Sequence, residues 1–132
     1  MNSPWLMQGD CLDRMKEIPD GSVDLVCCDL PYGTTDCKWD VIIPLETLWK
    51  HYDRLLKKNG IAVLTASQPF TSMLITSQPK WFKYCCYWKK EQGTGFARSK
   101  YQPLRIVEDI AIFCKSGSGT YNPKMVKRGR TV

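Results

Sequence analysis

Two apolar runs, Val23–Cys28 and Ile61–Ala66, constrain the fold of this chain more than any other feature of its sequence. The first is interrupted only by Asp24, which is typical of a strand covered on both faces of a sheet. Between the two runs, Pro44 begins a segment whose apolar residues recur at helical spacing, and we expect this helix to end at Asn59–Gly60. This strand–helix–strand order predicts an α/β fold with a largely parallel sheet.

The same periodicities predict the remaining elements. Leu12, Met15 and Ile18 recur at helical spacing after Asp10, which is a suitable N-cap. We expect strands over Trp5–Gln8, Trp81–Trp88 and Ile106–Cys114, a short helix within Gln68–Gln78, and a loop over Lys89–Pro103.

Length and composition indicate one ordinary globular domain, because the chain has 132 residues, of which 43% are hydrophobic. No run approaches the ~18 apolar residues of a membrane span, and the N-terminus lacks a secretory pattern, so we expect a cytoplasmic protein without a membrane partner. The seven cysteines show no C-x-x-C spacing, and the single histidine, His51, falls in an expected helix. We therefore expect no metal site and predict reduced, mostly buried thiols.

Charge is divided unevenly along the chain. Residues 1–79 contain 7 Lys/Arg and 10 Asp/Glu, whereas residues 80–132 contain 12 Lys/Arg and 3 Asp/Glu. The basic second part favours a polyanionic partner, although a merely solvated basic face is an equally good interpretation of charge alone. The candidate nucleic-acid contacts are Lys89, Lys90, Arg98, Lys100, Lys124, Lys127 and Arg128.

The segment Asp29-Leu30-Pro31-Tyr32 directly follows the first apolar run, at the strand end where ligands bind in open α/β sheets. The Asp29 carboxylate and the Leu30 carbonyl, made rigid by Pro31, are two acceptors that suit a planar NH₂ group. Tyr32 offers a flat face for stacking a heterocycle, a contact worth roughly 1–3 kcal/mol per base. The structural alternative is a plain tight turn after a strand.

This segment resembles the Asp-Pro-Pro-Tyr signature of the S-adenosylmethionine-dependent DNA amino-methyltransferases, and the chain resembles their prophage-type members over most of its length. The ordered features that carry the resemblance, besides this segment, are Gly9-Asp10-Cys11-Leu12, Pro19–Asp24, the strand after Gly60, Gln68-Pro69-Phe70, Trp88-Lys89 and Glu108–Phe113. The sequence departs from the family at Leu30, where a proline is usual.

The resemblance implies a catalytic site at Asp29, Leu30, Pro31 and Tyr32, which would hold the amino group of a base flipped out of double-stranded DNA. It also implies that S-adenosylmethionine binds at Asp10 and Cys11, although Asp10 serves equally well as a plain N-cap. Aspartate in the first signature position resembles the adenine-specific members. Methylation at cytosine carbon-5 needs a thiol nucleophile, which the enzymes of that class carry after a proline, and no cysteine in this sequence follows a proline.

The family's Gly-rich cofactor strand has no counterpart in this sequence. We therefore expect a partial Rossmann-like methyltransferase sheet, mostly parallel with an antiparallel C-terminal strand. Residues 1–115 would form the catalytic, target-base half, and the basic tail 116–132 would begin a target-recognition region. The Val23–Cys28 strand would then expose an edge, which predicts a homo-oligomer or a complementing chain. The alternatives are an inactive remnant that only binds nucleic acid, and an RNA or protein methyltransferase.

Overall fold

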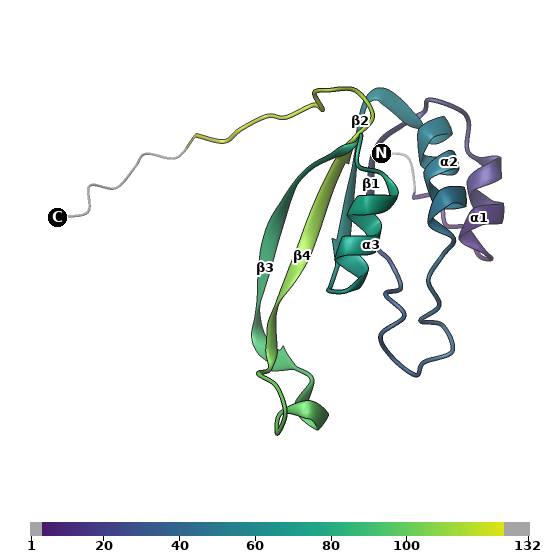
Figure 1. Cartoon of the computed structure of the whole chain (residues 1–132). Helices are drawn as coiled ribbons and strands as arrows, with labels where there is room; N and C mark the ends of the chain where they lie inside the picture. The colour runs from purple at the N-terminus through teal and green to yellow at the C-terminus, as the bar shows by residue number, and fades with distance from the viewer. Residues whose placement is uncertain (1–3, 126–132) are drawn as a thin grey trace.

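The strands form one four-stranded sheet in the order β1-β2-β4-β3, as a computed structural model shows for residues 4–125 (Figure 1). The elements in chain order are α1 (Cys11–Arg14), η1 (Met15–Glu17), β1 (Val23–Asp29), α2 (Leu45–Leu55), β2 (Leu56–Ala66), α3 (Phe70–Ser77), β3 (Phe82–Thr94), η2 (Phe96–Arg98) and β4 (Arg105–Cys114). The predicted α/β fold is confirmed.

The strand directions also agree with the sequence. Strand β2 pairs in parallel with β1 and antiparallel with β4, and β4 pairs antiparallel with β3. Strands β1, β2 and β3 therefore run in one direction, and the C-terminal strand β4 runs against them, as predicted. Their shared direction places the carboxyl ends of β1 and β2 at the same edge of the sheet, where Asp29 lies beside Thr65.

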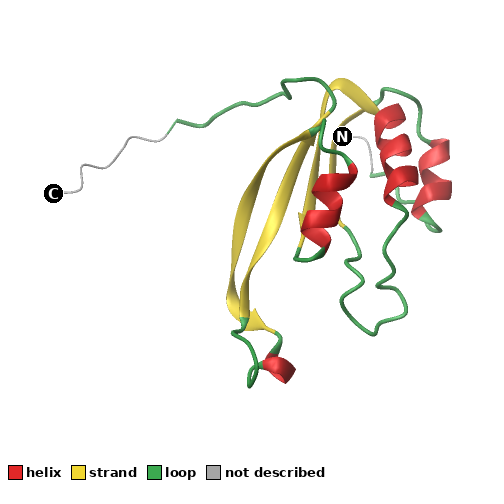
Figure 2. Cartoon of the chain, in the orientation of Figure 1, coloured by secondary structure: helices red, strands yellow, loops and turns green. Residues whose placement is uncertain are grey.

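One face of the sheet carries the helices, as Figure 2 shows. Helix α2 buries an apolar stripe against the sheet, since Leu48, Trp49, Tyr52 and Leu55 are all buried. The Trp49 indole Nε1–H donates to Ser77 Oγ at 2.8 Å, which links α2 to α3. The sheet residues beneath the helices, Ala62, Leu64, Ala66, Ala111 and Phe113, have no exposed surface and complete the core.

No helix of residues 4–125 packs on the opposite face of the sheet, which we call the open face (Figure 2). Its members are Leu25, Cys27, Ile61, Val63, Tyr84, Cys86, Ile110 and Ile112, which the strand register brings into neighbouring rows. Leu25 is 55% and Tyr84 51% exposed. The prediction that β1 is covered on both faces is therefore wrong for the described part of the chain, because its residues alternate between the core and the open face.

The boundary between α2 and β2 differs from the prediction. Helix α2 ends at Leu55, and Asn59–Gly60 lies within β2. Gly60 is required there by packing, because a Cβ would lie 2.9 Å from Leu56 Cδ2. The glycine therefore marks a close approach inside a strand and not a helix end.

Two other segments also differ from the sequence expectations. Trp5–Gln8 forms no strand, and Trp5 and Leu6 are exposed. Strand β3 continues to Thr94, so part of the expected Lys89–Pro103 loop is a hairpin arm paired with β4. No helix within residues 4–125 has the length and apolar character needed to cross a membrane.

The cysteines are more exposed than expected. Only Cys114 is buried, whereas Cys11, Cys27, Cys37 and Cys86 are exposed. Two of these, Cys27 and Cys86, lie on the open face, so the expectation of mostly buried thiols fails for the same reason as the expectation for β1.

Candidate functional site

Three polar groups converge where β1 and β2 end. The Tyr32 hydroxyl lies 2.8 Å from Asp29 Oδ1 and 2.8 Å from Thr65 Oγ1, and Thr65 Oγ1 also donates to Asp29 Oδ1. Each hydroxyl has one hydrogen, so Tyr32 can donate to Thr65 while Thr65 donates to Asp29. This arrangement fixes Oδ1 of the carboxylate, and no hydrogen bond among residues 4–125 involves Oδ2. Asp29 is exposed, so Oδ2 remains accessible to a ligand.

Tyr32 is half-buried and is supported from one side. Its ring stacks on Phe70, with ring centroids 5.5 Å apart and an interplanar angle of 25°. Burial raises the pKa of the Tyr32 hydroxyl, the Thr65 hydroxyl opposes this, and the Asp29 carboxylate adds to it. The hydroxyl is therefore protonated at neutral pH and acts as a donor to its neighbours.

Leu30 and Pro31 connect Asp29 and Tyr32. The Leu30 side chain is 4% exposed and belongs to the core cluster, whereas Pro31 is half-buried. A leucine at this position therefore anchors the segment in the core. The sequence interpretation considered only the Leu30 carbonyl and missed this contribution of its side chain.

Asp40 is a further organising residue that the sequence did not single out. Its carboxylate accepts hydrogen bonds from the backbone N–H groups of Gly33, Thr34 and Thr35, at 2.8–2.9 Å, and from the Thr35 hydroxyl. These donors, first the Thr35 hydroxyl and then the Gly33 N–H, lower the pKa of Asp40 to about 2. Gly33 has a φ of +65°, and a Cβ there would lie 2.9 Å from Ile42 Cγ1. Asp40 and Gly33 together fix the turn that follows Tyr32.

Asp10 and Cys11 lie beside this turn. Asp10 is the N-cap of α1, since its Oδ1 accepts from Leu12 N–H at 2.8 Å. Both residues also line a cavity of about 200 Å³ whose other walls are Leu12 and the segment Val41 to Pro44. Burial, and then the Asp10 charge, raise the pKa of the Cys11 thiol. The structure thus shows the N-cap role of Asp10 and places Asp10 and Cys11 together at one cavity.

The candidate nucleic-acid residues of the second half lie mainly on the β3–β4 hairpin arm, which reaches beyond the helices at the same end as the 33–44 loop (Figure 1). Lys89 and Lys100 are exposed on this arm, and Arg98 ends η2. Exposed aromatic side chains lie between the basic ones, namely Tyr87, Trp88, Phe96 and Tyr101. Lys124 is exposed in the C-terminal segment, and Lys127 and Arg128 lie outside the described residues.

Lys90 differs from the other candidates. Its Nζ pairs with the Glu108 carboxylate and lies 5.5 Å from the Trp88 ring centroid. The lysine and glutamate side chains are 24% and 15% exposed, so the pair is largely shielded from water. Its charge is used within the hairpin arm, and we do not include Lys90 among the phosphate contacts proposed below.

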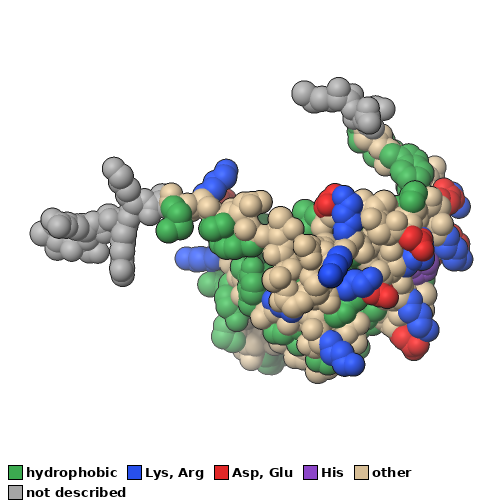
Figure 3. Space-filling model, turned by 90° about the horizontal axis from the view of Figure 1, so that it is seen from above, with side chains coloured by type: hydrophobic (Ala, Val, Ile, Leu, Met, Phe, Trp, Pro, Cys, Tyr) green, Lys and Arg blue, Asp and Glu red, His purple; other side chains and the backbone are tan. Residues whose placement is uncertain are grey.

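Charges on the helices are paired with one another. Around α1 and α2, ion pairs join Arg14 to Glu17, Lys16 to Asp13 and Lys50 to Glu46. Seen from above, basic and acidic side chains are intermixed over this part of the molecule, and apolar side chains gather towards β3 and β4 (Figure 3). The helix side is therefore a solvated mixed-charge surface, unlike the hairpin arm.

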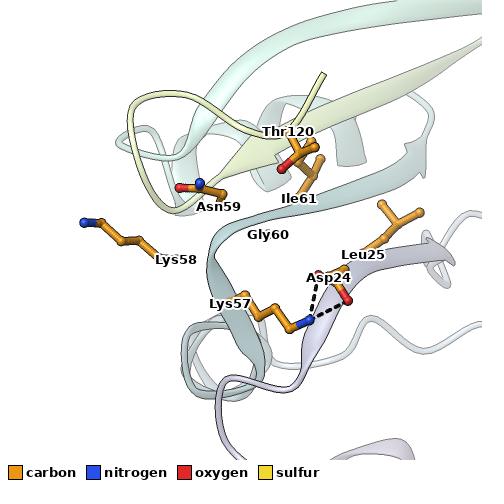
Figure 4. A pocket seen from close by; sticks show the side chains of 8 residues that line it. All are labelled: Asp24, Leu25, Lys57, Lys58, Asn59, Gly60, Ile61 and Thr120. Carbon is orange, nitrogen blue, oxygen red and sulfur yellow. Dashed lines mark hydrogen bonds and ion pairs between the residues drawn. The ribbon is translucent and has the colours of Figure 1, made fainter. Parts of the chain in front are cut away.

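A second cavity, of about 530 Å³, lies at the amino ends of β1 and β2 (Figure 4). Lys57 Nζ contacts both carboxylate oxygens of Asp24 there, at 2.7 and 2.8 Å, so the two charges neutralise each other. In a parallel pair, this is the end opposite to Asp29 and Thr65. We regard it as a structural cavity of the strand connections.

The known proteins that this chain matches are methyltransferases. No protein-family model matches the chain. The type II methyltransferase M1.MboII of Moraxella bovis is 26% identical over 125 residues, which cover 87% of this chain and 47% of that enzyme. The chain therefore spans about half the length of the curated relative it matches.

Solved structures share the fold. The M1.HpyAVI–SAM complex matches with a TM-score of 0.66 at 18% identity, over 96% of this chain and 62% of that one. The cytosine-N4-specific PvuII DNA methyltransferase matches with a TM-score of 0.62 at 14% identity, over 84% and 49%. TTHA0409 of Thermus thermophilus, described as a DNA modification methylase, matches with 0.59 at 22%, over 88% and 54%. In sequence and in fold, this chain is similar to the S-adenosylmethionine-dependent DNA amino-methyltransferases, of which it spans about half.

Proposed function

We propose that this chain is the target-base half of a DNA methyltransferase that acts on the exocyclic amino group of adenine. The observation that carries the proposal is the arrangement of Asp29 and Tyr32. The carboxylate is held through Oδ1 by Thr65 and Tyr32, which leaves Oδ2 to accept an amine hydrogen. The Tyr32 ring, supported by Phe70, provides a surface on which the purine stacks.

The chemistry requires positioning rather than a covalent intermediate. S-adenosylmethionine, when bound, supplies an electrophilic methyl group. Asp29 Oδ2 and the Leu30 carbonyl accept the two amine hydrogens, which favours a pyramidal nitrogen whose lone pair points at the methyl carbon. Methyl transfer would release the cofactor as its neutral thioether and leave the nitrogen positively charged, and Asp29 would stabilise that charge until the proton passes to solvent.

The chain contributes only part of a cofactor site. The cavity at Asp10 and Cys11 has about 200 Å³, less than the roughly 300–1,000 Å³ of a complete small-molecule pocket. Its apolar walls suit an adenine ring, and Asp10 Oδ2 suits the ring's amino group. The rest of S-adenosylmethionine would be held by a segment outside this sequence.

Adenine is preferred over cytosine because the signature begins with aspartate. The cytosine-N4-specific PvuII enzyme shares the fold, so the base must be identified from the product. Analysis of methylated DNA by mass spectrometry should find N6-methyladenine, whereas N4-methylcytosine would contradict the proposed base.

Double-stranded DNA is the proposed partner of the hairpin arm. Lys89 and Lys100 are exposed near Trp88 and Tyr101, which combines phosphate-neutralising charges with stacking surfaces. The arm lies at the carboxyl ends of β1 and β2, so DNA bound along it would present a flipped base to Asp29.

A second protein partner would cover the open face and the free edge of β1. Among residues 4–125, no strand pairs with the outer edge of β1, and the open face beside it is apolar. A complementing chain with the cofactor-binding strands would bury both surfaces, and a homo-oligomer is the second possibility. Light scattering at micromolar concentrations should therefore find a species larger than the monomer, and a strictly monomeric protein would contradict self-association.

The direct test is transfer of labelled methyl from S-adenosylmethionine to duplex DNA. Asp29→Ala should abolish labelling, whereas Asp24→Ala, a carboxylate at the opposite end of the same strand, should retain it. Equal labelling by both variants would contradict the role of Asp29.

The competing functions predict different products. Label in RNA or protein but not in DNA would identify the other methyltransferase class. DNA binding without calorimetric binding of S-adenosylmethionine and without any labelling would identify an inactive nucleic-acid-binding remnant.

A further inference from the structure

A polar cavity of about 440 Å³ adjoins the Asp29–Tyr32 site but is lined by neither of these residues. It is lined by Thr34, Thr35, Gln68, Pro69, Thr94, Gly95, Gln102 and Arg105. Thr34 lies two residues after Tyr32, and Pro69 precedes the Phe70 that stacks on Tyr32. The cavity therefore lies between the signature turn, the start of α3 and the hairpin arm.

Arg105 gives this cavity its charge. One guanidinium nitrogen, Nη1, donates to Ser67 Oγ at 2.6 Å, and Ser67 is only 4% exposed. The buried serine fixes the direction of the guanidinium, while Arg105 itself is exposed. Within residues 4–125, Arg105 forms no ion pair, in contrast to Arg14, Arg54 and Lys90.

The other lining residues are neutral, and Thr34, Gln68 and Gln102 bring hydroxyl and amide donors, whereas the hydroxyls of Thr35 and Thr94 donate within the chain. Of the two carboxylates in this turn, Asp36 is exposed, and Asp40 accepts from the backbone N–H groups of Gly33, Thr34 and Thr35 and from the Thr35 hydroxyl. These donors offset its charge. The cavity thus combines one oriented, unpaired cation with neutral hydrogen-bond donors, which suits an anion with several oxygens.

We propose that this cavity binds a backbone phosphodiester of the DNA strand whose base occupies the Asp29–Tyr32 site, with Arg105 as the positioning residue. The proposal rests on the proposed function and extends it to the strand adjacent to the base. Ser67 lies two residues beyond Thr65, or roughly 7 Å of extended chain. A phosphate at Arg105 and a base at Asp29 are therefore close enough to belong to neighbouring parts of one strand. Phosphate contacts of this kind fix the position of the protein along the strand but do not distinguish one base sequence from another.

The test is the salt dependence of oligonucleotide binding to the full chain, measured by fluorescence anisotropy with a short labelled strand containing one adenine among thymines. Arg105→Ala should reduce the slope of log K against log salt by about 0.7, the value for one phosphate contact on a single strand. Arg105→Lys should keep the slope, because it keeps the charge, but should bind more weakly. Lys58→Ala, which removes a cation at the opposite end of β2, should leave the slope unchanged.

Neutral methylphosphonate linkages placed one at a time along the strand locate the contact. One linkage near the adenine should weaken binding to the original chain and have no further effect on Arg105→Ala. Circular dichroism melting checks that the variants are folded, and Arg105→Lys provides the comparison if the alanine variant unfolds.

The outcomes separate this inference from the function on which it rests. If the original chain binds the strand but Arg105→Ala keeps the same slope and the same methylphosphonate profile, the phosphate site is wrong and the proposed function stands. If the original chain binds neither this strand nor duplex DNA, both proposals are overturned.

Discussion

The two faces of the sheet have the same strands and opposite environments. On the helix face, Leu64 and Phe113 have no exposed surface, whereas Leu25 and Tyr84 on the open face are more than half exposed. Both faces are apolar, so the difference does not come from residue type. It arises because the described residues include helices on one face of the sheet and none on the other.

This contrast explains how a chain that spans half of its relative can still hold Asp29 and Tyr32 in a fixed arrangement. The helix face supplies the stability that holds β1 and β2 together, and with them Asp29 and Thr65. The open face and the β1 edge instead provide apolar surface suited to a partner. Predictions about the two faces therefore test two different functions of one sheet.

The largest expected difference is in stability. Phe113→Ala removes a fully buried ring that contacts Trp49 and Phe82, and should lower the free energy of unfolding by about 3–5 kcal/mol. Tyr84→Ala, on the open face, should lower it by less than about 1.5 kcal/mol, because half of its surface is already in water. Urea unfolding measures the free energy of unfolding of both variants. Equal losses of that free energy would show that the open face is covered in the isolated protein.

A second effect depends on pH and belongs to the turn that leads from Tyr32 to the core residue Ile42. The folded-state pKa of Asp40 is about 2, below its ordinary value of 3.8. The carboxylate therefore contributes stability that is fully present above pH 3.8 and is lost as the pH falls towards 2. The urea midpoint should fall more steeply across this window in the original chain than in Asp40→Asn, and identical profiles would contradict the role of the Asp40 charge.

The sequence predicted the elements that repeat a simple pattern. The apolar runs at β1 and β2 and the stripe of α2 follow from periodicity, and the position of Asp29 follows from the strand end that it terminates. The strand directions were also predictable, because the antiparallel C-terminal strand was part of the resemblance.

What the sequence did not show depends on tertiary neighbours. Trp5–Gln8 is apolar enough for a strand but has no strand to pair with among the described residues. A glycine at position 60 is compatible both with a helix end and with a crowded strand. Only the position of Leu56, which leaves no room for a Cβ, shows that Gly60 lies in a crowded strand. Thr65, Asp40 and Arg105 gave no signal, because each acts through a partner distant in sequence or across a turn.

Thiol chemistry compares the two faces directly. In the isolated chain, Cys27 and Cys86 on the open face should react with iodoacetamide well before Cys28 and Cys85, which are half-buried against the core of the helix face, as mass spectrometry of the peptides would show. Cys37, exposed in the loop, is the control for reagent access. Selective protection of Cys27 and Cys86 that grows with protein concentration would identify a homo-oligomer through the open face.

The smallest expected effect concerns the amino ends of the strands. Lys57→Ala breaks the exposed pair with Asp24 and should change stability by no more than about 1 kcal/mol, an effect that salt reduces further. DNA binding should be unaffected, since this cavity lies at the opposite end from Asp29. A marked loss of binding would mean that the amino ends contribute to the nucleic-acid surface.

The most direct test of the central claim is photo-crosslinking of an oligonucleotide that carries 8-azidoadenine in place of one adenine. Mass spectrometry should locate the crosslink in the peptide that contains Tyr32, and Asp29→Ala should reduce it. Crosslinks confined to the aromatic residues of the hairpin arm, with none at Tyr32, would contradict the claim that Asp29 and Tyr32 hold the base.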